Sequence, residues 1–371
     1  VSPIEEPAGT EISAPFVNRP GYHLKHWTLN GEPYQFTVMP EENITLEAEW
    51  SEELTNLPAL FIDLSDESGN QVNLADVQKS YVKSTISLSN TEDEYILSSL
   101  DSQFKGRGNG SWNEAKKGYK IKFDKKQSLF GRAANKHWVI IACANFDDPT
   151  MSRNYLAYNM AGEVFDGIEY STNAVWVDIY VNGEYRGVYI LCEHVRVGTG
   201  RVDIESEYTN EPEANGFLIE YDAYAAGTEG VDYFRVSGLK YGFSMHSPDP
   251  EDYAEEITKA EYQHQVSYIQ DYVTRVYNAA LSKNFTEFSE LADVDSFVDM
   301  YILHELFKNM DTGYSSFYLY KKPNGKLYAG PPWDFDATTS ADDGNGRGNR
   351  TPQGLYVATG AGSDNTICEL Y

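Results

Sequence analysis

Residues 309–336, NMDTGYSSFYLYKKPNGKLYAGPPWDFD, place one acid on a loop, then two strand-like runs, then two acids around one aromatic residue. Residues 294–308 carry apolar side chains at helical spacings, which predicts a mostly buried helix ending just before Asp311. The apolar positions of that helix are Phe297, Met300, Tyr301, Leu303, Leu306 and Phe307. Residues 317–320 and 326–328 flank Pro-Asn-Gly, which predicts a β-hairpin.

The hairpin should carry the chain from Asp311 back to Asp334, so we expect the two carboxylates to lie within about 10 Å of each other. Phosphoryl transfer uses this order of groups, because one carboxylate receives a hydroxyl proton and the other holds the magnesium that bridges the ATP phosphates. The alternative is that Asp311, Asp334 and Asp336 only stabilise turns, as Asp often does beside Gly and Pro.

Residues 104–123, FKGRGNGSWNEAKKGYKIKF, put a glycine-rich loop before a predicted strand. Strand alternation places Lys120 and Lys122 on one face. The other face carries Tyr119, Ile121 and Phe123. Backbone N–H groups of a glycine loop and a lysine beyond it can bind phosphates, although no Gly-Lys-Ser/Thr follows as in the phosphate loop of NTPases. The alternative is a solvated basic turn.

The chain is strongly acidic, with 29 Lys and Arg against 57 Asp and Glu and a net charge of −28 over 371 residues. This charge argues against nucleic-acid binding, which depends on neutralising phosphates, and favours a basic protein partner. We expect no membrane span, because no apolar run has the required length. The three cysteines are too few for a disulfide scaffold, and buried thiols are expected at Cys143 and Cys192.

Several motifs occur in a characteristic order: GRGNGSW, KKGYKIKF, LFG (129–131), HWVIIACANFDD (137–148), VDIYVNGEYRGVYILCEHV (177–195), GFLIEYD (216–222), NMD and PPWDFD. Over residues 57–371 the chain thereby resembles the spore-coat protein H (CotH) kinase-like family. The resemblance implies an atypical, secreted-type protein-kinase fold that uses ATP and Mg²⁺, or another divalent cation, to phosphorylate protein hydroxyls.

The resemblance also implies roles for single residues. Asp311 matches the catalytic acid, Asp334 the metal-binding acid, and Asp336 is its neighbouring candidate. Many members, like typical kinases, place an Asn about five residues after the catalytic acid as a second metal ligand, whereas this chain has Ser316. A serine hydroxyl is a neutral, shorter ligand, so we expect slow turnover. The expected nucleotide-binding residues are Arg107, Asn109, Lys117, Lys120, Lys122 and Glu193.

The first fifty residues have a different pattern. Residues 15–50 contain Gly-Tyr, a central Trp27, an Asn-Gly turn at Asn30, Met-Pro, and an alternating strand that ends at Trp50. This pattern predicts hairpins around a small aromatic core. It resembles a Listeria–Bacteroides (internalin B-type) repeat, a small β-grasp-like module of bacterial surface and secreted proteins, which implies a spacing or adhesive role.

The fold class expected is therefore α+β, with a linker and β-grasp-like repeat at 1–53 and an atypical two-lobed protein-kinase-like domain at 54–371. Its N-lobe spans about 54–195, with one helix at about 149–165, and its C-lobe about 196–371, opening with an amphipathic helix at about 252–282. A polar, glycine-rich run at 341–350 is expected to form a loop. Because the last residues read as the start of another helix, we expect the C-lobe to continue beyond Tyr371.

These features favour a bacterial secreted or cell-surface enzyme that transfers the γ-phosphoryl group of ATP to a protein hydroxyl, with a basic, Ser/Thr-rich acceptor and possible extracellular assembly. The alternative is a weak or inactive kinase-like fold that serves as an extracellular binding or scaffold protein, for which the 14% aromatic content offers some support. A zinc protease is disfavoured, because His304-Glu305 begins an HExxH pattern whose fifth residue is Lys308.

Overall fold

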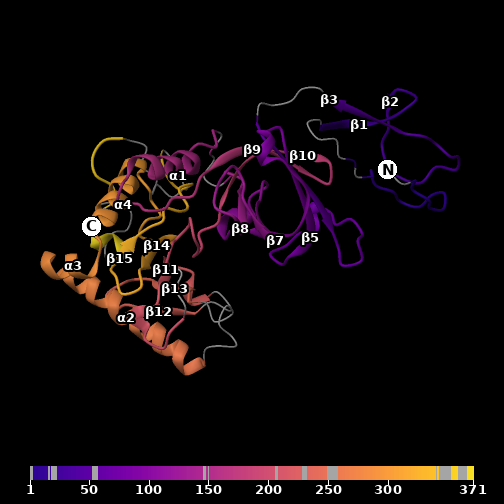
Figure 1. Cartoon of the computed structure of the whole chain (residues 1–371). Coiled ribbons are helices and arrows are strands. Elements are labelled where there is room, and N and C mark those ends of the chain that lie inside the picture. The colour runs from indigo at the N-terminus through magenta and orange to yellow at the C-terminus, as the bar shows by residue number, and fades with distance from the viewer. Residues whose placement is uncertain are drawn as a thin grey trace. The chain divides into compact units, whose positions relative to one another are not determined.

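The computed structural model describes the chain except residues 1–2, 16, 18–22, 52–56, 145–147, 149, 205–207, 228–231, 249–257, 340, 342–351 and 358–365. The chain is α+β, with two compact units coloured along the sequence in Figure 1. Unit 1 consists of Val1–Ala142 and Val175–Cys192, and unit 2 of Cys143–Ala174 and Glu193–Tyr371. The expected Gly-Tyr of the repeat, the start of the helix near 252, and residues 342–350 of the polar loop lie outside the described residues.

The N-terminal segment forms a 3-stranded sheet in the order β2-β1-β3. Its strands are β1 (His23–Leu29), β2 (Glu32–Pro33) and β3 (Glu47–Ser51). The Asn-Gly turn predicted there is present, and Asn30 and Gly31 have φ values of 53° and 85°, as in a type I′ turn. Trp27 is 8% exposed and packs edge-on against Phe36, with ring centroids 6.3 Å apart. The aromatic core is thus confirmed, and the assignment to an internalin-type repeat stays a prediction.

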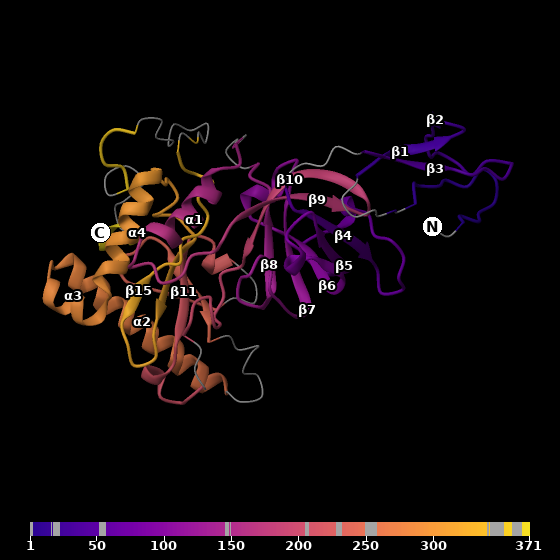
Figure 2. The ribbon, with the colours of Figure 1, turned by 45° about the horizontal axis from the view of Figure 1, so that its top comes forward.

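The rest of unit 1 is a closed barrel with the strand order β10-β8-β7-β6-β5-β4-β9, visible in Figure 2. Its strands are β4 (Ala59–Ser65), β5 (Val82–Ser89), β6 (Leu97–Arg107), β7 (Gly118–Gln127), β8 (Asn135–Ile141), β9 (Val175–Val181) and β10 (Glu184–Glu193). β7 forms a strand where it was predicted, and on its apolar face Ile121 and Phe123 are no more than 1% exposed and Tyr119 is 6% exposed. The apolar face of β7 therefore belongs to the barrel core. On the other face Lys122 is half-buried, but Lys120 is 9% exposed, so burial does not alternate along the whole strand.

The barrel closes through a parallel pair, β4 with β9, in which Leu60 pairs with Ile179. Asn182 and Gly183 form the turn between the antiparallel strands β9 and β10, and Asn182 has a left-handed φ of 50°. The Asn182 side chain accepts a hydrogen bond from Leu64 N–H at 2.9 Å and donates one to the Val72 carbonyl at 2.8 Å. One turn residue therefore also fixes the loop that follows β4.

Unit 2 contains a 5-stranded antiparallel sheet in the order β12-β13-β11-β14-β15. Its strands are β11 (Phe217–Asp222), β12 (Tyr233–Arg235), β13 (Gly242–Ser247), β14 (Phe317–Lys321) and β15 (Leu327–Ala329). Its helices are α1 (Arg153–Val164), α2 (Lys259–Leu281), α3 (Phe285–Leu291) and α4 (Val294–Phe307). A capping box between Thr258 and Glu261 starts α2, which lies along the sheet in Figure 1.

The helix predicted before Asp311 is α4, and the hairpin predicted after it is β14–β15. Phe297, Met300, Leu303 and Phe307 are buried as expected. Leu306 is 55% exposed and does not join them, because it lies on the same side of α4 as the exposed Val298 and Ile302. Among the described helices, none has an apolar stretch long enough to cross a membrane.

Candidate functional site

Asp311 lies in a tight loop at the end of α4. Lys308 adopts a left-handed φ of 51° and ends the helix. Behind it, Asn309 is 2% exposed, and its Oδ1 accepts a hydrogen bond from the Asp311 N–H at 2.9 Å. The Asp311 carbonyl accepts hydrogen bonds from the N–H groups of Tyr314 at 2.8 Å and Ser315 at 3.2 Å. The backbone of this acid is therefore fixed on both sides.

The 334–336 triplet is held by side chains of α1. The N–H of its first residue donates to Tyr158 Oη at 3.0 Å, the N–H of the second donates to Asn154 Oδ1 at 2.8 Å, and Arg153 Nη1 donates to the carbonyl of the third at 3.1 Å. Trp333 stacks on Tyr158, with ring centroids 5.5 Å apart and planes 9° from parallel. A helix more than 170 residues earlier thus fixes the segment that carries Asp334 and Asp336.

The two loops meet where Ser316 Oγ donates a hydrogen bond to Asp334 Oδ2 at 3.2 Å. Both residues have left-handed backbones, with φ values of 61° and 60°. Such a conformation in a residue other than glycine costs on the order of 1 to 3 kcal/mol and is common at functional sites. The contact places the loop that begins at Asp311 directly beside the Asp334 carboxylate.

Asp334, Ser316 and Asp336 are the candidate ligands of a divalent cation. Asp334 and Ser316 contribute a carboxylate and a hydroxyl side by side, and Asp336 is 9% exposed one residue beyond Phe335. In the part of the chain that the structure describes, no group of three His, Cys, Asp or Glu side chains is arranged to hold a metal. Mg²⁺ commonly binds through one or two carboxylates and takes its other ligands from water and phosphate oxygens. The donors present therefore fit Mg²⁺ that arrives with a nucleotide.

Basic side chains share one face of β6 and β7, opposite the face that carries the buried Phe104, Ile121 and Phe123. Lys105 pairs across the strands with Lys120, and Lys122 is the next residue of that face on β7. Arg107 follows Lys105 by two residues and so shares its face. Lys120 is only 9% exposed, and the Lys122 ammonium lies 5.8 Å from the centroid of the Tyr81 ring. We call Lys105, Arg107, Lys120 and Lys122 the basic face.

The glycine loop between β6 and β7 is held by its own side chains. Gly108 has a φ of 107°, and a Cβ on Gly106 would lie 2.0 Å from the Trp112 ring, so the loop requires both glycines. The Lys117 ammonium donates to the carbonyl of Trp112 at 2.5 Å and to that of Glu114 at 3.2 Å. Lys117 thus stabilises the loop, which also carries Asn109.

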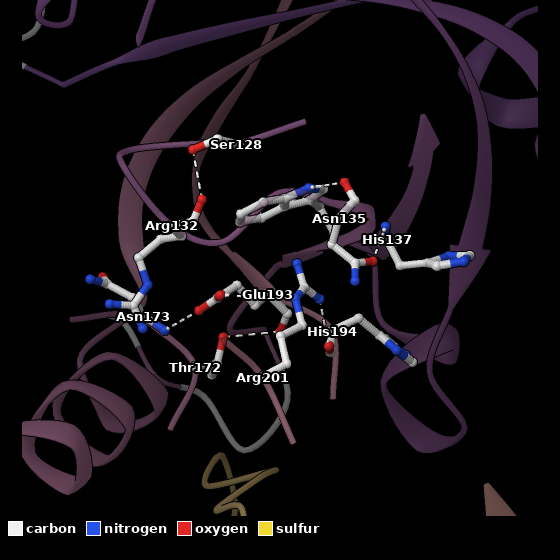
Figure 3. Close-up of polar contacts among 10 residues, drawn as sticks. Ser128, Arg132, Asn135, His137, Thr172, Asn173, Glu193, His194 and Arg201 are labelled. Carbon is white, nitrogen blue, oxygen red and sulfur yellow. Dashed lines mark hydrogen bonds and ion pairs between the residues drawn. The ribbon is translucent and has the colours of Figure 1, made fainter. Parts of the chain in front are cut away.

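Glu193, the last residue of β10, is fully buried (Figure 3). Its Oε2 accepts a hydrogen bond from Asn173 N–H at 3.0 Å, and its carbonyl accepts one from Thr172 Oγ1 at 3.0 Å. The Arg201 guanidinium lies 3.9 Å from Oε1 and donates to the His194 carbonyl at 2.7 Å. This environment favours a structural role for Glu193, and its expected contact with a nucleotide stays a prediction.

A family model described as CotH kinase protein matches residues 104–363. The chain belongs to this family. No curated protein matches it. The matched segment of this CotH chain contains each candidate residue predicted from the sequence, from Arg107 to Asp336.

Sequence reasoning did not single out Lys105 of the basic face, nor Asn154 and Tyr158, which hold the 334–336 triplet. Lys105 had a usable signal, because Lys105 and Arg107 alternate with Phe104 and Gly106 along one strand. Asn154 and Tyr158 had none, since they reach the 334–336 triplet only through tertiary packing of α1. The joint action of the predicted residues in catalysis stays a prediction.

Proposed function

We propose that this chain is an ATP-dependent protein kinase that transfers the γ-phosphoryl group to a protein hydroxyl. The observation that carries the proposal is the hydrogen bond between Ser316 and Asp334, which places the loop of the candidate catalytic acid beside the candidate metal ligand. Membership of the CotH kinase family supports it. The basic face supplies positive charge, which a nucleotide triphosphate requires and which is scarce in a chain of net charge −28.

In the proposed reaction Asp311 accepts the proton of the acceptor hydroxyl as its oxygen bonds to the γ-phosphorus and the bond from that phosphorus to the bridging oxygen of ADP breaks. Asp334 would hold Mg²⁺, with Ser316 and Asp336 as further candidates, and the cation would neutralise charge on the phosphates. Of the basic face, we expect Arg107, Lys120 and Lys122 to pair with phosphate oxygens, with Lys122 foremost.

The decisive experiment compares wild type with Asp311→Asn in a radiolabelled-ATP assay with a basic, Ser-rich acceptor. We expect the substitution to reduce transfer at least 100-fold and to leave ATP affinity, measured by calorimetry, within about threefold, because this acid acts on the acceptor and not on the nucleotide. Asp271→Asn, at an exposed position of α2, is the matched control and should behave as wild type. Equal transfer by wild type and Asp311→Asn would reject the assignment.

The second candidate is a binding or scaffold protein that retains the fold with little turnover. Ser316 favours it, because serine is shorter than the Asn that many members place there, and its hydroxyl already donates a hydrogen bond to Asp334 Oδ2. This candidate predicts no calorimetric signal with ATP and Mg²⁺, whereas the kinase proposal predicts saturable binding.

The proposed setting is a bacterial secreted or cell-surface one, with a basic, Ser/Thr-rich protein as acceptor. The setting rests on the resemblance of the first fifty residues to an internalin-type repeat, and the acceptor on the acidity of the chain. The division into a module at 1–53, a kinase-like N-lobe at about 54–195 and a C-lobe at about 196–371 belongs to the same proposal.

A further inference from the structure

His304 lies on α4 with its imidazole ring between two aromatic side chains. Its ring centroid is 5.5 Å from that of Phe317 and 4.9 Å from that of Phe335, with planes 24° and 19° from parallel. Phe317 directly follows Ser316, and Phe335 is the middle residue of the 334–336 triplet. One buried ring, 2% exposed, therefore contacts both segments of the candidate site.

The hydrogen bonds of His304 orient the Asp311 loop. Its Nδ1 lies 3.1 Å from Asn309 Nδ2 and 3.0 Å from Thr312 Oγ1. Because Asn309 Oδ1 accepts from the Asp311 N–H, the amide must present its NH₂ group to the imidazole. Nδ1 must then be an acceptor, which assigns the proton of the neutral ring to Nε2. A relay runs from His304 through Asn309 to the backbone of Asp311.

The stability of the fold alone does not require a histidine at position 304. Among the described residues, His304 Nε2 is buried without a hydrogen-bond partner. An orphaned buried N–H is unfavourable, and a phenylalanine would keep the stacking without it. Burial also lowers the pKa of His304 to about 3, so the ring stays neutral at physiological pH and Nδ1 stays able to accept. The specific contribution of a histidine here is the acceptor at Nδ1.

We propose that His304 is a positioning residue, which sets the Asp311 loop through Asn309 and aligns it with the 334–336 triplet through the Phe317–His304–Phe335 stack. The inference rests on the proposed function, because Asp311 and Asp334 are the groups it positions. His304 acts through these neighbours and has no assigned contact with nucleotide or acceptor.

Three variants separate the roles of the ring. His304→Phe keeps the stack and removes the acceptor, while His304→Asn offers an amide oxygen near the position of Nδ1 and removes the ring. Phe297→Leu is the matched control, because Phe297 is a buried residue of the same helix that packs against Phe288 and lies outside the relay. Thermal unfolding of each variant reports on folding.

Hydrogen exchange gives a readout that needs no catalysis. In His304→Phe, exchange of the Asp311 amide should rise at least tenfold above that of wild type, because Asn309 loses the partner that fixes its amide orientation. His304→Asn should retain most of the protection, and Phe297→Leu should change exchange in this loop less than twofold. Equal protection in His304→Phe and wild type would overturn the proposal.

Kinetics give the second readout. His304→Phe should lower kcat at least tenfold with KM for ATP within about threefold, since misplacing a catalytic group affects the transition state more than binding. Asn309→Ala should lower kcat similarly, and the double variant no further than the single ones. If wild type transfers the phosphoryl group and His304→Phe does so at the same rate, the inference is rejected and the proposed function is kept. Absence of transfer in wild type would reject the proposed function, and the exchange experiment would still test the relay.

Discussion

The hydroxyl of Ser316 donates to Oδ2 of Asp334 at 3.2 Å, between two residues that both have left-handed backbones. Eighteen residues and a complete hairpin separate the two positions. Under the proposed function this oxygen would also bind the cation, and the cation would then displace or share the hydrogen bond from Ser316.

Ser316→Asn should raise activity. Asparagine brings a carbonyl oxygen to the cation, and it tolerates a φ of 61° better than serine does. We expect a several-fold increase in kcat and a lower Mg²⁺ concentration at half-maximal rate, measured in a magnesium titration of phosphoryl transfer. Ser315→Asn is the neighbouring control and should leave the titration unchanged. A rate that falls in Ser316→Asn would show that the serine itself is required.

Asp334→Asn should weaken metal-dependent nucleotide binding. Asparagine preserves the shape of the residue and its left-handed backbone, so the loss reports the charge alone. We expect ATP affinity in the presence of Mg²⁺ to fall at least tenfold, while affinity without Mg²⁺ changes little. Calorimetric titrations with and without the cation measure both values. Equal losses in the two titrations would indicate a damaged fold instead of a lost cation ligand.

The basic face should provide most of the affinity for phosphate. Lys120→Gln and Lys122→Gln should each lower ATP affinity about tenfold, because charge-assisted hydrogen bonds to phosphate contribute roughly 1.5 to 3 kcal/mol each. Lys126→Gln, at an exposed position near the end of β7, is the matched control. Adenosine, which has no phosphate, should bind all three variants and wild type alike.

Stability should fall in acid because of His304. Its pKa is lowered from 6.5 to about 3 in the fold, so its contribution to stability is present above about pH 6.5 and is lost as the pH falls toward 3. The slope is at most about 1.4 kcal/mol per pH unit. Urea unfolding between pH 7 and pH 4 measures this effect. As the pH falls, the free energy of unfolding of wild type should decrease relative to that of His304→Phe.

Two carboxyl groups have the opposite effect on the pH dependence of stability over part of that pH range. Burial raises the pKa of Asp63 and of Asp222 from 3.8 to about 6, so the folded state binds more protons between those values and their terms favour folding as the pH falls. Both groups are present in wild type and variant, so their terms cancel in the comparison. A pH-independent difference between wild type and His304→Phe would contradict the assigned burial of a neutral histidine.

The sequence by itself determined the local elements of this protein. Helix α4, the β14–β15 hairpin and the turns at Asn30 and Asn182 follow from apolar periodicity and from residues that accept a left-handed backbone. The alternating faces of β7 follow in the same way. Each of these features depends on interactions over a few residues, which a sequence displays directly.

Only the tertiary structure decided how these elements are combined. The parallel pairing of β4 with β9 closes the barrel across more than 100 residues, and α1 holds the 334–336 triplet from 176 to 183 residues away. The imidazole of His304 connects two loops that look unrelated along the chain. Such contacts form when apolar faces are buried together and the polar groups buried with them must be hydrogen-bonded. The local spacing of residues does not predict which distant residue will be the partner.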